Sequence, residues 1–186
     1  QQYQSLIGSL QWAVSIGRID ITTAVMTLSS FRAVPRKAHL KRAQRVVSYV
    51  AKFKESTIRF CTQEPDYSDI PSFAYDWESK YEEAAEDVPN DAPTPLGKFV
   101  VIATHVDANL CHDLITGKSV SGILHWLNGT PIDWFSKKQG AVETATYGSE
   151  FMAARLSVEQ IKTLRDTLRY LGVPLRDKSF MFGDHK

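Results

Sequence analysis

Residues 99–139 have the sequence FVVIATHVDANLCHDLITGKSVSGILHWLNGTPIDWFSKKQ. The segment opens with an uninterrupted apolar run from Phe99 to Ala103, which is typical of a strand that is covered on both faces. Three further residues lead from this run into Asp107. We therefore expect the first strand of a sheet here, with Asp107 at its end.

Two more strands are expected in the same segment. Apolar side chains alternate with others from Val120 to Leu127, as in a strand with two different faces. Asn128-Gly129 follows, and this dipeptide is the strongest short signal for a β-hairpin. Ile132 and Trp134 continue the alternation beyond the turn. The pattern predicts three antiparallel strands.

A helical region and a fourth strand complete the expected fold. One face stays apolar from Tyr147 to Leu171, Thr144 or Thr146 is a candidate N-cap, and Gly172 is a candidate helix stop. A break near Ser157 would divide the region into two helices. Residues 180–182 then form a strand that leads to Asp184. The fold class is thus α/β, with three antiparallel strands, helices and a further strand.

Three carboxylates occupy notable places in this fold: Asp107, Glu150 and Asp184. If the last strand lies parallel to the first, both aspartates meet at one end of the sheet, and the helix can bring Glu150 to them. Clustered carboxylates repel one another unless a cation compensates, and hard oxygen ligands suit Mg²⁺ or Mn²⁺. Acids at strand ends are also common in α/β domains that bind no metal, so spacing leaves both interpretations open.

Other chemistries find little support in the sequence. His105, Cys111 and His112 lack the spacing of a zinc site and a second ligand pair. Gly117-Lys118-Ser119 is a poor match to a phosphate-binding loop. We therefore expect no zinc.

Residues 1–60 are expected to form three short helices, divided at Gly17 and at Pro35, with Asp20 as the cap of the second. The third helix carries an expected buried stripe: Leu40, Ala43, Val46, Val47, Val50 and Phe53. Its other notable face is basic and polar: Lys37, Lys41, Arg45, Ser48 and Lys52. That face can follow a phosphate backbone or be a solvated helix surface.

The charges are unevenly distributed along the chain. Residues 1–60 carry ten Lys or Arg and two acids, whereas residues 61–98 carry ten acids, two lysines and five prolines. Self-repulsion and proline oppose compact structure, so residues 61–98 are interpreted as an acidic connector. Its aromatic residues are unusual for a spacer and indicate docking on a neighbouring surface: Phe73, Tyr75, Trp77 and Tyr81.

Composition bounds the class of protein. The 186 residues are 43% apolar, 23% charged and 11% aromatic, which argues against wholesale disorder, collagen and coiled coils. No apolar run approaches the ~20 residues of a membrane helix. The two cysteines form no motif, which favours a reducing compartment. Because the chain begins with Gln rather than Met, we expect a piece of a longer protein.

Residues 99–186 resemble the ribonuclease H domain of copia-type retrotransposon polyproteins. The motifs that carry the resemblance agree in order and spacing over about half the chain: Asp107-Ala108, Lys118-Ser119-Val120-Ser121-Gly122, Pro131-Ile132-Asp133-Trp134-Phe135-Ser136-Lys137-Lys138-Gln139, Glu150-Phe151-Met152-Ala153 and Phe182-Gly183-Asp184. Residues 1–60 resemble the end of the reverse transcriptase module of the same polyproteins. The matching residues are Tyr3 to Leu10, Ile19 to Ile21, His39-Leu40 and Arg45 to Tyr49.

The resemblance implies a ribonuclease H-like fold, here cut short at its C-terminus. Asp107, Glu150 and Asp184 would be catalytic ligands of two Mg²⁺ ions. The implied activity is hydrolysis of the RNA strand of an RNA–DNA hybrid. A fragment lacking downstream ligands would then cleave little. Nucleic acid would contact six cations: Lys37, Lys41, Arg45, Lys52, Lys137 and Lys138.

The implied partners are the hybrid and the upstream palm and fingers of the same polyprotein, with no membrane. The implied location is intracellular, either cytoplasmic in virus-like particles or nuclear. A degenerate remnant that binds nucleic acid without cleaving it is the alternative.

Overall fold

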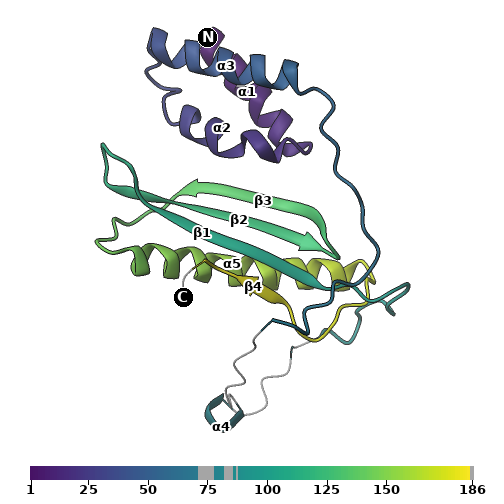
Figure 1. Cartoon of the computed structure of the whole chain (residues 1–186). Helices are drawn as coiled ribbons and strands as arrows, with labels where there is room; N and C mark the ends of the chain where they lie inside the picture. Colours follow the sequence, from purple (N-terminus) through teal and green to yellow (C-terminus); the bar gives the residue numbers. More distant parts are fainter. Residues whose placement is uncertain (71–77, 82–85, 87, 185–186) are drawn as a thin grey trace.

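A four-stranded sheet lies between two helical layers in the computed structural model, which describes residues 1–70, 78–81, 86 and 88–184 (Figure 1). The strands are β1 (Ile102–Asp113), β2 (Lys118–Leu127), β3 (Thr130–Lys138) and β4 (Phe180–Phe182). Their order in the sheet is β3-β2-β1-β4. β1 to β3 pair antiparallel, and β4 is parallel to β1. The predicted mixed sheet, with its last strand beside the first, is confirmed.

The hairpin between β2 and β3 forms where the sequence predicted it. Asn128 and Gly129 both have positive φ, 47° and 78°, as the tight primed turns require. Asn128 is also buried, and its side chain is hydrogen-bonded there. Its Oδ1 accepts the Val101 N–H at 2.8 Å, and its amide donates to the Phe99 carbonyl. The turn residue therefore anchors the start of β1 as well.

The first strand differs from its predicted bounds. β1 begins at Ile102 and continues six residues beyond Asp107, to Asp113, so the prediction that Asp107 ends the strand is wrong. Ala108 and Asn109 still pair with β2, and an irregularity follows before Asp113. Cys111, with φ of 50°, lies in this irregular part. Asp107 consequently lies near the middle of β1 rather than at its end.

The helix α5 (Thr146–Tyr170) covers one face of the sheet as a single helix, so the predicted break near Ser157 is wrong. Ser149, Ala153 and Ser157 are fully buried at four-residue intervals. These small side chains allow α5 to lie close to the sheet. Neither threonine caps the helix, because Ala145 is the N-cap. The predicted stop is confirmed at Gly172, whose φ is 72°.

We expect Ala153→Leu to destabilise the protein by about 1–3 kcal/mol, because the larger side chain would push α5 away from the sheet. The matched control is Ala51→Leu on α3 (Lys37–Lys52), where Ala51 is exposed. The midpoints of urea unfolding provide the measurement. Equal midpoints for the two variants would contradict close packing between α5 and the sheet.

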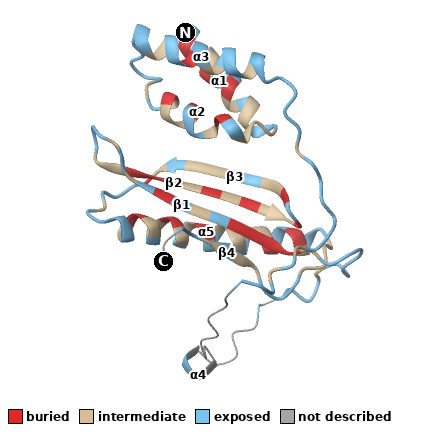
Figure 2. Ribbon diagram, viewed as in Figure 1, coloured by how far each residue is buried: buried red, intermediate tan, exposed pale blue. Residues whose placement is uncertain are grey.

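The N-terminal part contains α1 (Gln2–Ser15), the 3₁₀ turn η1 (Ile19–Ile21), α2 (Thr22–Ser29) and α3. Its side chains form a core of their own, shown among the red residues of Figure 2: Tyr3, Ile7, Leu10, Ile21, Val25, Leu28 and Ala43. Most of the predicted α3 stripe packs on this core, but Val47 and Phe53 are exposed.

Asp20 does not cap α2. It lies in the 3₁₀ turn and accepts two hydrogen bonds from the Arg18 guanidinium, at 3.0 and 2.8 Å. This pairing lowers the pKa of Asp20. The helices reach the sheet through Trp134 of β3, whose indole N–H donates to the Val14 carbonyl at 3.0 Å.

The described part of the connector contacts the α/β part, so a freely solvated spacer is not what the structure shows there. The Cys61 N–H donates to Thr130 Oγ1, and Leu96 N–H donates to the Gly172 carbonyl. The short helix α4 (Glu78–Tyr81) also belongs to this region. Phe73, Tyr75 and Trp77 lie outside the described residues, as does the side chain of Tyr81, and the domain boundaries stay predictions.

Candidate active site

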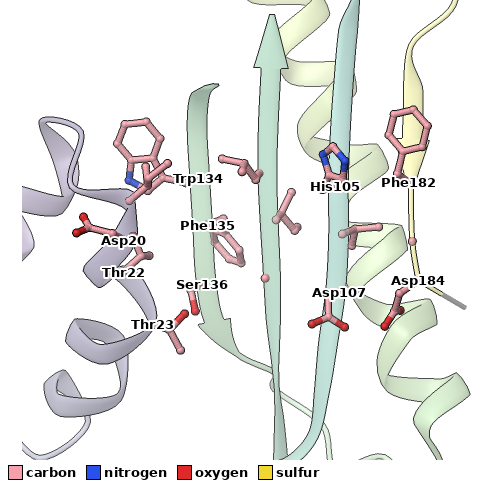
Figure 3. Close-up of a pocket in the computed structure, with 16 residues that line it drawn as sticks. Asp20, Thr22, Thr23, His105, Asp107, Trp134, Phe135, Ser136, Phe182 and Asp184 are labelled. Carbon is pink, nitrogen blue, oxygen red and sulfur yellow. The ribbon is translucent and has the colours of Figure 1, made fainter. Parts of the chain in front are cut away.

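Asp107 of β1 and Asp184, which follows the end of the parallel strand β4 by two residues, lie side by side (Figure 3). His105 pairs with Phe182 across β1 and β4, and each aspartate lies two residues further along. Gly122 stands opposite Asp107, and Ser136 stands opposite Gly122. Because directly opposite residues of a sheet share a face, a row runs from Ser136 to Asp184 across all four strands.

The face that this row occupies follows from the alternation of β1. His125 of β2 is buried and bonds Thr104 through Nδ1 and Gln160 of α5 through Nε2, at 2.8 and 3.0 Å. Thr104 and its opposite partner His125 therefore face α5. Asp107 is three residues beyond Thr104, so its side chain points to the other face. That is the face on which the N-terminal helices lie.

A groove of about 790 Å³ lies on this second face. Its floor includes His105, Leu124 and the two aspartates, and Thr22 and Thr23 of α2 form part of its wall (Figure 3). Gly122 lies in the floor, and a Cβ added there would have only ordinary contact, 4.0 Å from the Asp107 carbonyl. The groove therefore gives a ligand access to the Asp107 row.

Glu150 approaches the aspartates from α5. Asp107, Glu150 and Asp184 are all among the residues that line a second, smaller hollow of about 230 Å³. The aromatic residues Tyr147 and Phe151 line it as well. Within the described part of the chain, however, no three His, Cys, Asp or Glu side chains lie close enough together to hold a metal ion. The physical reason is that Asp107 points away from the face that α5 covers. The donor atoms suit Mg²⁺, but this structure does not assemble them into a ligand set.

The start of α5, next to Glu150, is held by Gln139, the last residue of the motif that begins at Pro131. Gln139 is buried, and its amide donates to Ser121 Oγ at 3.0 Å and to the Ser149 carbonyl at 2.8 Å. Gln139 thereby ties the end of β3 to the first turns of α5, next to Glu150. The motif included Gln139 but did not show its structural role, because its hydrogen-bond partners come from two other elements.

The six predicted nucleic-acid contacts do not form one surface. Lys37, Lys41, Arg45 and Lys52 are exposed on α3, which lies on the side of the helical layer away from the sheet (Figure 1). Lys137 is exposed on β3. Lys138 forms an ion pair with Asp113, and its hydrogen bond holds the pKa of that carboxyl well below its usual range. The prediction that these cations contact nucleic acid is not tested by their positions.

The two cysteines of the chain lie apart from the proposed carboxylate site, and the expectation of no zinc stays a prediction. Cys61 and Cys111 are both free thiols in exposed positions. No helix of the described residues has the length and apolar character needed to cross a bilayer.

Similarity to known proteins is distant but extends over most of the chain. It is 25% identical over 162 residues to the transposon Ty5-1 protein of Saccharomyces cerevisiae, covering 86% of this chain and 41% of that protein. It is 24% identical over 171 residues to the retrovirus-related Pol polyprotein from transposon TNT 1-94 of Nicotiana tabacum, covering 92% of this chain and 10% of the polyprotein. The chain is thus distantly homologous to Pol polyproteins of copia-type retrotransposons, and spans less than half the length of either relative.

A third relative has a length similar to this chain. Secreted RxLR effector protein 161 of Plasmopara viticola is 24% identical over 151 residues, which are 81% of this chain and 82% of that protein. No protein-family model matches the chain, and neither does any solved structure.

Proposed function

We propose that residues 99–186 are a ribonuclease H-like domain of retrotransposon origin, which hydrolyses the RNA strand of RNA–DNA hybrids. The observation that carries the proposal is the side-by-side placement of Asp107, on β1, and Asp184, just beyond the parallel strand β4, with Glu150 lining the same hollow. Distant homology to retrovirus-related Pol polyproteins of transposons supports this assignment. Within it, residues 1–60 are the end of a reverse transcriptase module, and residues 61–98 join the two.

The proposed ligands are Asp107, Glu150 and Asp184, which would bind Mg²⁺, with Mn²⁺ as a substitute. Two such ions, when bound, would activate a water molecule and stabilise the leaving oxygen of the RNA strand. The chain supplies the carboxylates and the groove. The floor glycine, Gly122, leaves room for a phosphate backbone beside Asp107. Gln139 holds the helix that carries Glu150.

The test is cleavage of an RNA–DNA hybrid with Mg²⁺, by the longest natural polypeptide that contains these residues. We expect Glu150→Gln to lower the rate at least about a hundredfold, because it removes a charged ligand. Glu159→Gln on the same helix is the matched control, since Glu159 pairs with Arg155 in solvent. Equal rates for the two variants would remove Glu150 from the site.

The basic face of α3 has a separate test in this proposal. Replacing Lys41 and Arg45 by Gln should weaken hybrid binding in the absence of divalent metal, and reduce the slope of log K against log salt by about 2, one for each lost phosphate contact. The control removes the same charge from α5, with Arg155 and Lys162 replaced by Gln, because both are exposed. The same loss of slope in both variants would indicate unspecific attraction.

The second candidate is a remnant that binds nucleic acid and has lost cleavage. One observation favours it: the described carboxylates are not drawn together into a metal-holding group. The sequences similar to this chain also include a secreted effector protein of comparable length, which is not a Pol polyprotein by name. Hybrid binding without cleavage, at any Mg²⁺ or Mn²⁺ concentration, would identify the remnant. The intracellular location and the upstream palm and fingers as partners belong to the first proposal.

A further inference from the structure

The strand that leads to Asp184 is the shortest strand of the sheet. β4 has three residues, lies at the sheet edge and, among the described residues, pairs with β1 alone. A strand of this length forms few backbone hydrogen bonds and has little stability of its own. Its place therefore depends on contacts outside the sheet.

Arg165 of α5 holds the segment that leads into β4. Its side chain is only 8% exposed. The guanidinium donates to the Arg176 carbonyl at 3.1 Å, to the Asp177 carbonyl at 3.3 Å and to Ser179 Oγ at 2.9 Å. These three acceptors directly precede Phe180, the first residue of β4. Arg165 thus attaches the segment that precedes β4 to α5.

The counter-ion of Arg165 comes from the acidic connector. Glu86 accepts from Arg165 Nε at 2.5 Å and from Nη2 at 2.7 Å, and it also pairs with Arg169. A buried guanidinium without an opposite charge is costly, so Glu86 allows Arg165 to remain in place. A second connector carboxylate, Glu64, makes two hydrogen bonds of 3.0 Å to Arg176 in the same lead-in segment.

The connector also packs on β4 itself. The ring of Tyr67 lies 4.6 Å from the ring of Phe180 and 5.5 Å from that of Phe182, between centroids. Desolvation by this packing raises the pKa of Tyr67. Tilted aromatic pairs at such distances are favourable beyond the area that they bury. Tyr67 therefore packs against β4. Glu64 and Glu86 bind arginines that lie in, or are bonded to, the segment before the strand.

We propose that the connector is a clamp for β4, and that Tyr67 and Glu86 are positioning residues that set the place of Asp184 beside Asp107. The structural part of this inference stands on the contacts alone. Its catalytic part rests on the proposed function. Three described residues of the connector then have a specific use: Glu64 and Glu86 bind arginines of the α/β part, and the ring of Tyr67 covers the edge strand.

Amide hydrogen exchange tests the structural part in the 186-residue chain. We expect Tyr67→Ala and Glu86→Gln each to accelerate exchange in residues 178–184 by about tenfold, with β2 and β3 unchanged. Phe60→Ala and Glu159→Gln are the matched controls, because Phe60 is 86% exposed and Glu159 binds only an exposed arginine among the described pairs. Unchanged exchange at β4 overturns the clamp, and so does equal acceleration throughout the sheet.

The Mg²⁺ dependence of hybrid cleavage tests the positioning role in the natural polypeptide. Tyr67→Ala should raise the Mg²⁺ concentration for half-maximal rate by about tenfold, with the KM for hybrid unchanged. Tyr67→Phe keeps the ring and should keep the wild-type Mg²⁺ requirement. An unchanged Mg²⁺ requirement, despite faster exchange at β4, overturns the positioning role. If the wild-type protein cleaves no hybrid, the proposed function fails, and the exchange experiment still decides the clamp.

Discussion

Asp107→Asn is expected to lower hybrid cleavage by about a thousandfold or more. Several kcal/mol of transition-state stabilisation come from bound metal ions, and each 1.4 kcal/mol is about tenfold in rate. Asn keeps the shape of the side chain but removes the negative charge that would bind Mg²⁺. Single-turnover cleavage of a labelled hybrid, with saturating protein, gives the rate of the chemical step.

Asp133→Asn is the matched control for this loss. Asp133 lies on β3, is exposed, and its carboxylate accepts a hydrogen bond from the backbone N–H of Trp134. Unfolding midpoints of both variants should stay close to the wild-type value, because Asp107 is exposed as well. Undiminished cleavage by folded Asp107→Asn protein would contradict the assignment of the site.

Ile7→Ala should have the largest effect on stability, about 2–5 kcal/mol. Ile7 is fully buried at the centre of the N-terminal core. A core of seven side chains supplies little net stability, so the loss should unfold residues 1–53 as a unit. We expect their amides to lose protection from exchange, while β1 to β3 keep theirs.

The same substitution at the exposed C-cap residue of α1 provides the control. Ile16 is 61% exposed, and Ile16→Ala should leave the exchange pattern nearly unchanged. Simultaneous loss of protection in the helices and in the sheet of the Ile7 variant would show one cooperative unit. The division at residue 60 would then be wrong.

Local signals predicted the hairpin and the end of α5 well. Asn128-Gly129 supplies the positive φ values of a tight turn, and Gly172 supplies the positive φ of a helix end. The predicted break of the helix failed for a physical reason. Ser157 is a poor helix former in isolation, but here its small size allows α5 to pack against the sheet.

The neighbouring placement of the two aspartates was predictable from the sequence, but the position of Glu150 relative to them was not. The pairing of β1 with β4 brings Asp107 and Asp184 together as expected. The pattern of β1 alone did not show that the strand continues to Asp113. Nor did it show that the side chain of Asp107 points away from α5, which keeps Glu150 from joining the aspartates in a compact ligand set.

The role of the connector lay beyond any local pattern. Its ion pairs join residues far apart in sequence: Glu86 binds Arg165, 79 positions later, and Glu64 binds Arg176, 112 positions later. Charge composition alone predicts repulsion and extension for such a segment. Only the folded arrangement shows that the arginines of the α/β part lie where the acids can reach them.

Strand-specific cleavage of one RNA–DNA hybrid is the most direct test of the proposed function. The hybrid carries a different label on each strand and is incubated with the natural polypeptide, with Mg²⁺ and with a chelator. We predict that the RNA strand is cut only when Mg²⁺ is present and that the DNA strand stays intact. Intact RNA at every Mg²⁺ concentration, or cleavage that persists with the chelator, would contradict a metal-dependent ribonuclease H site at Asp107, Glu150 and Asp184.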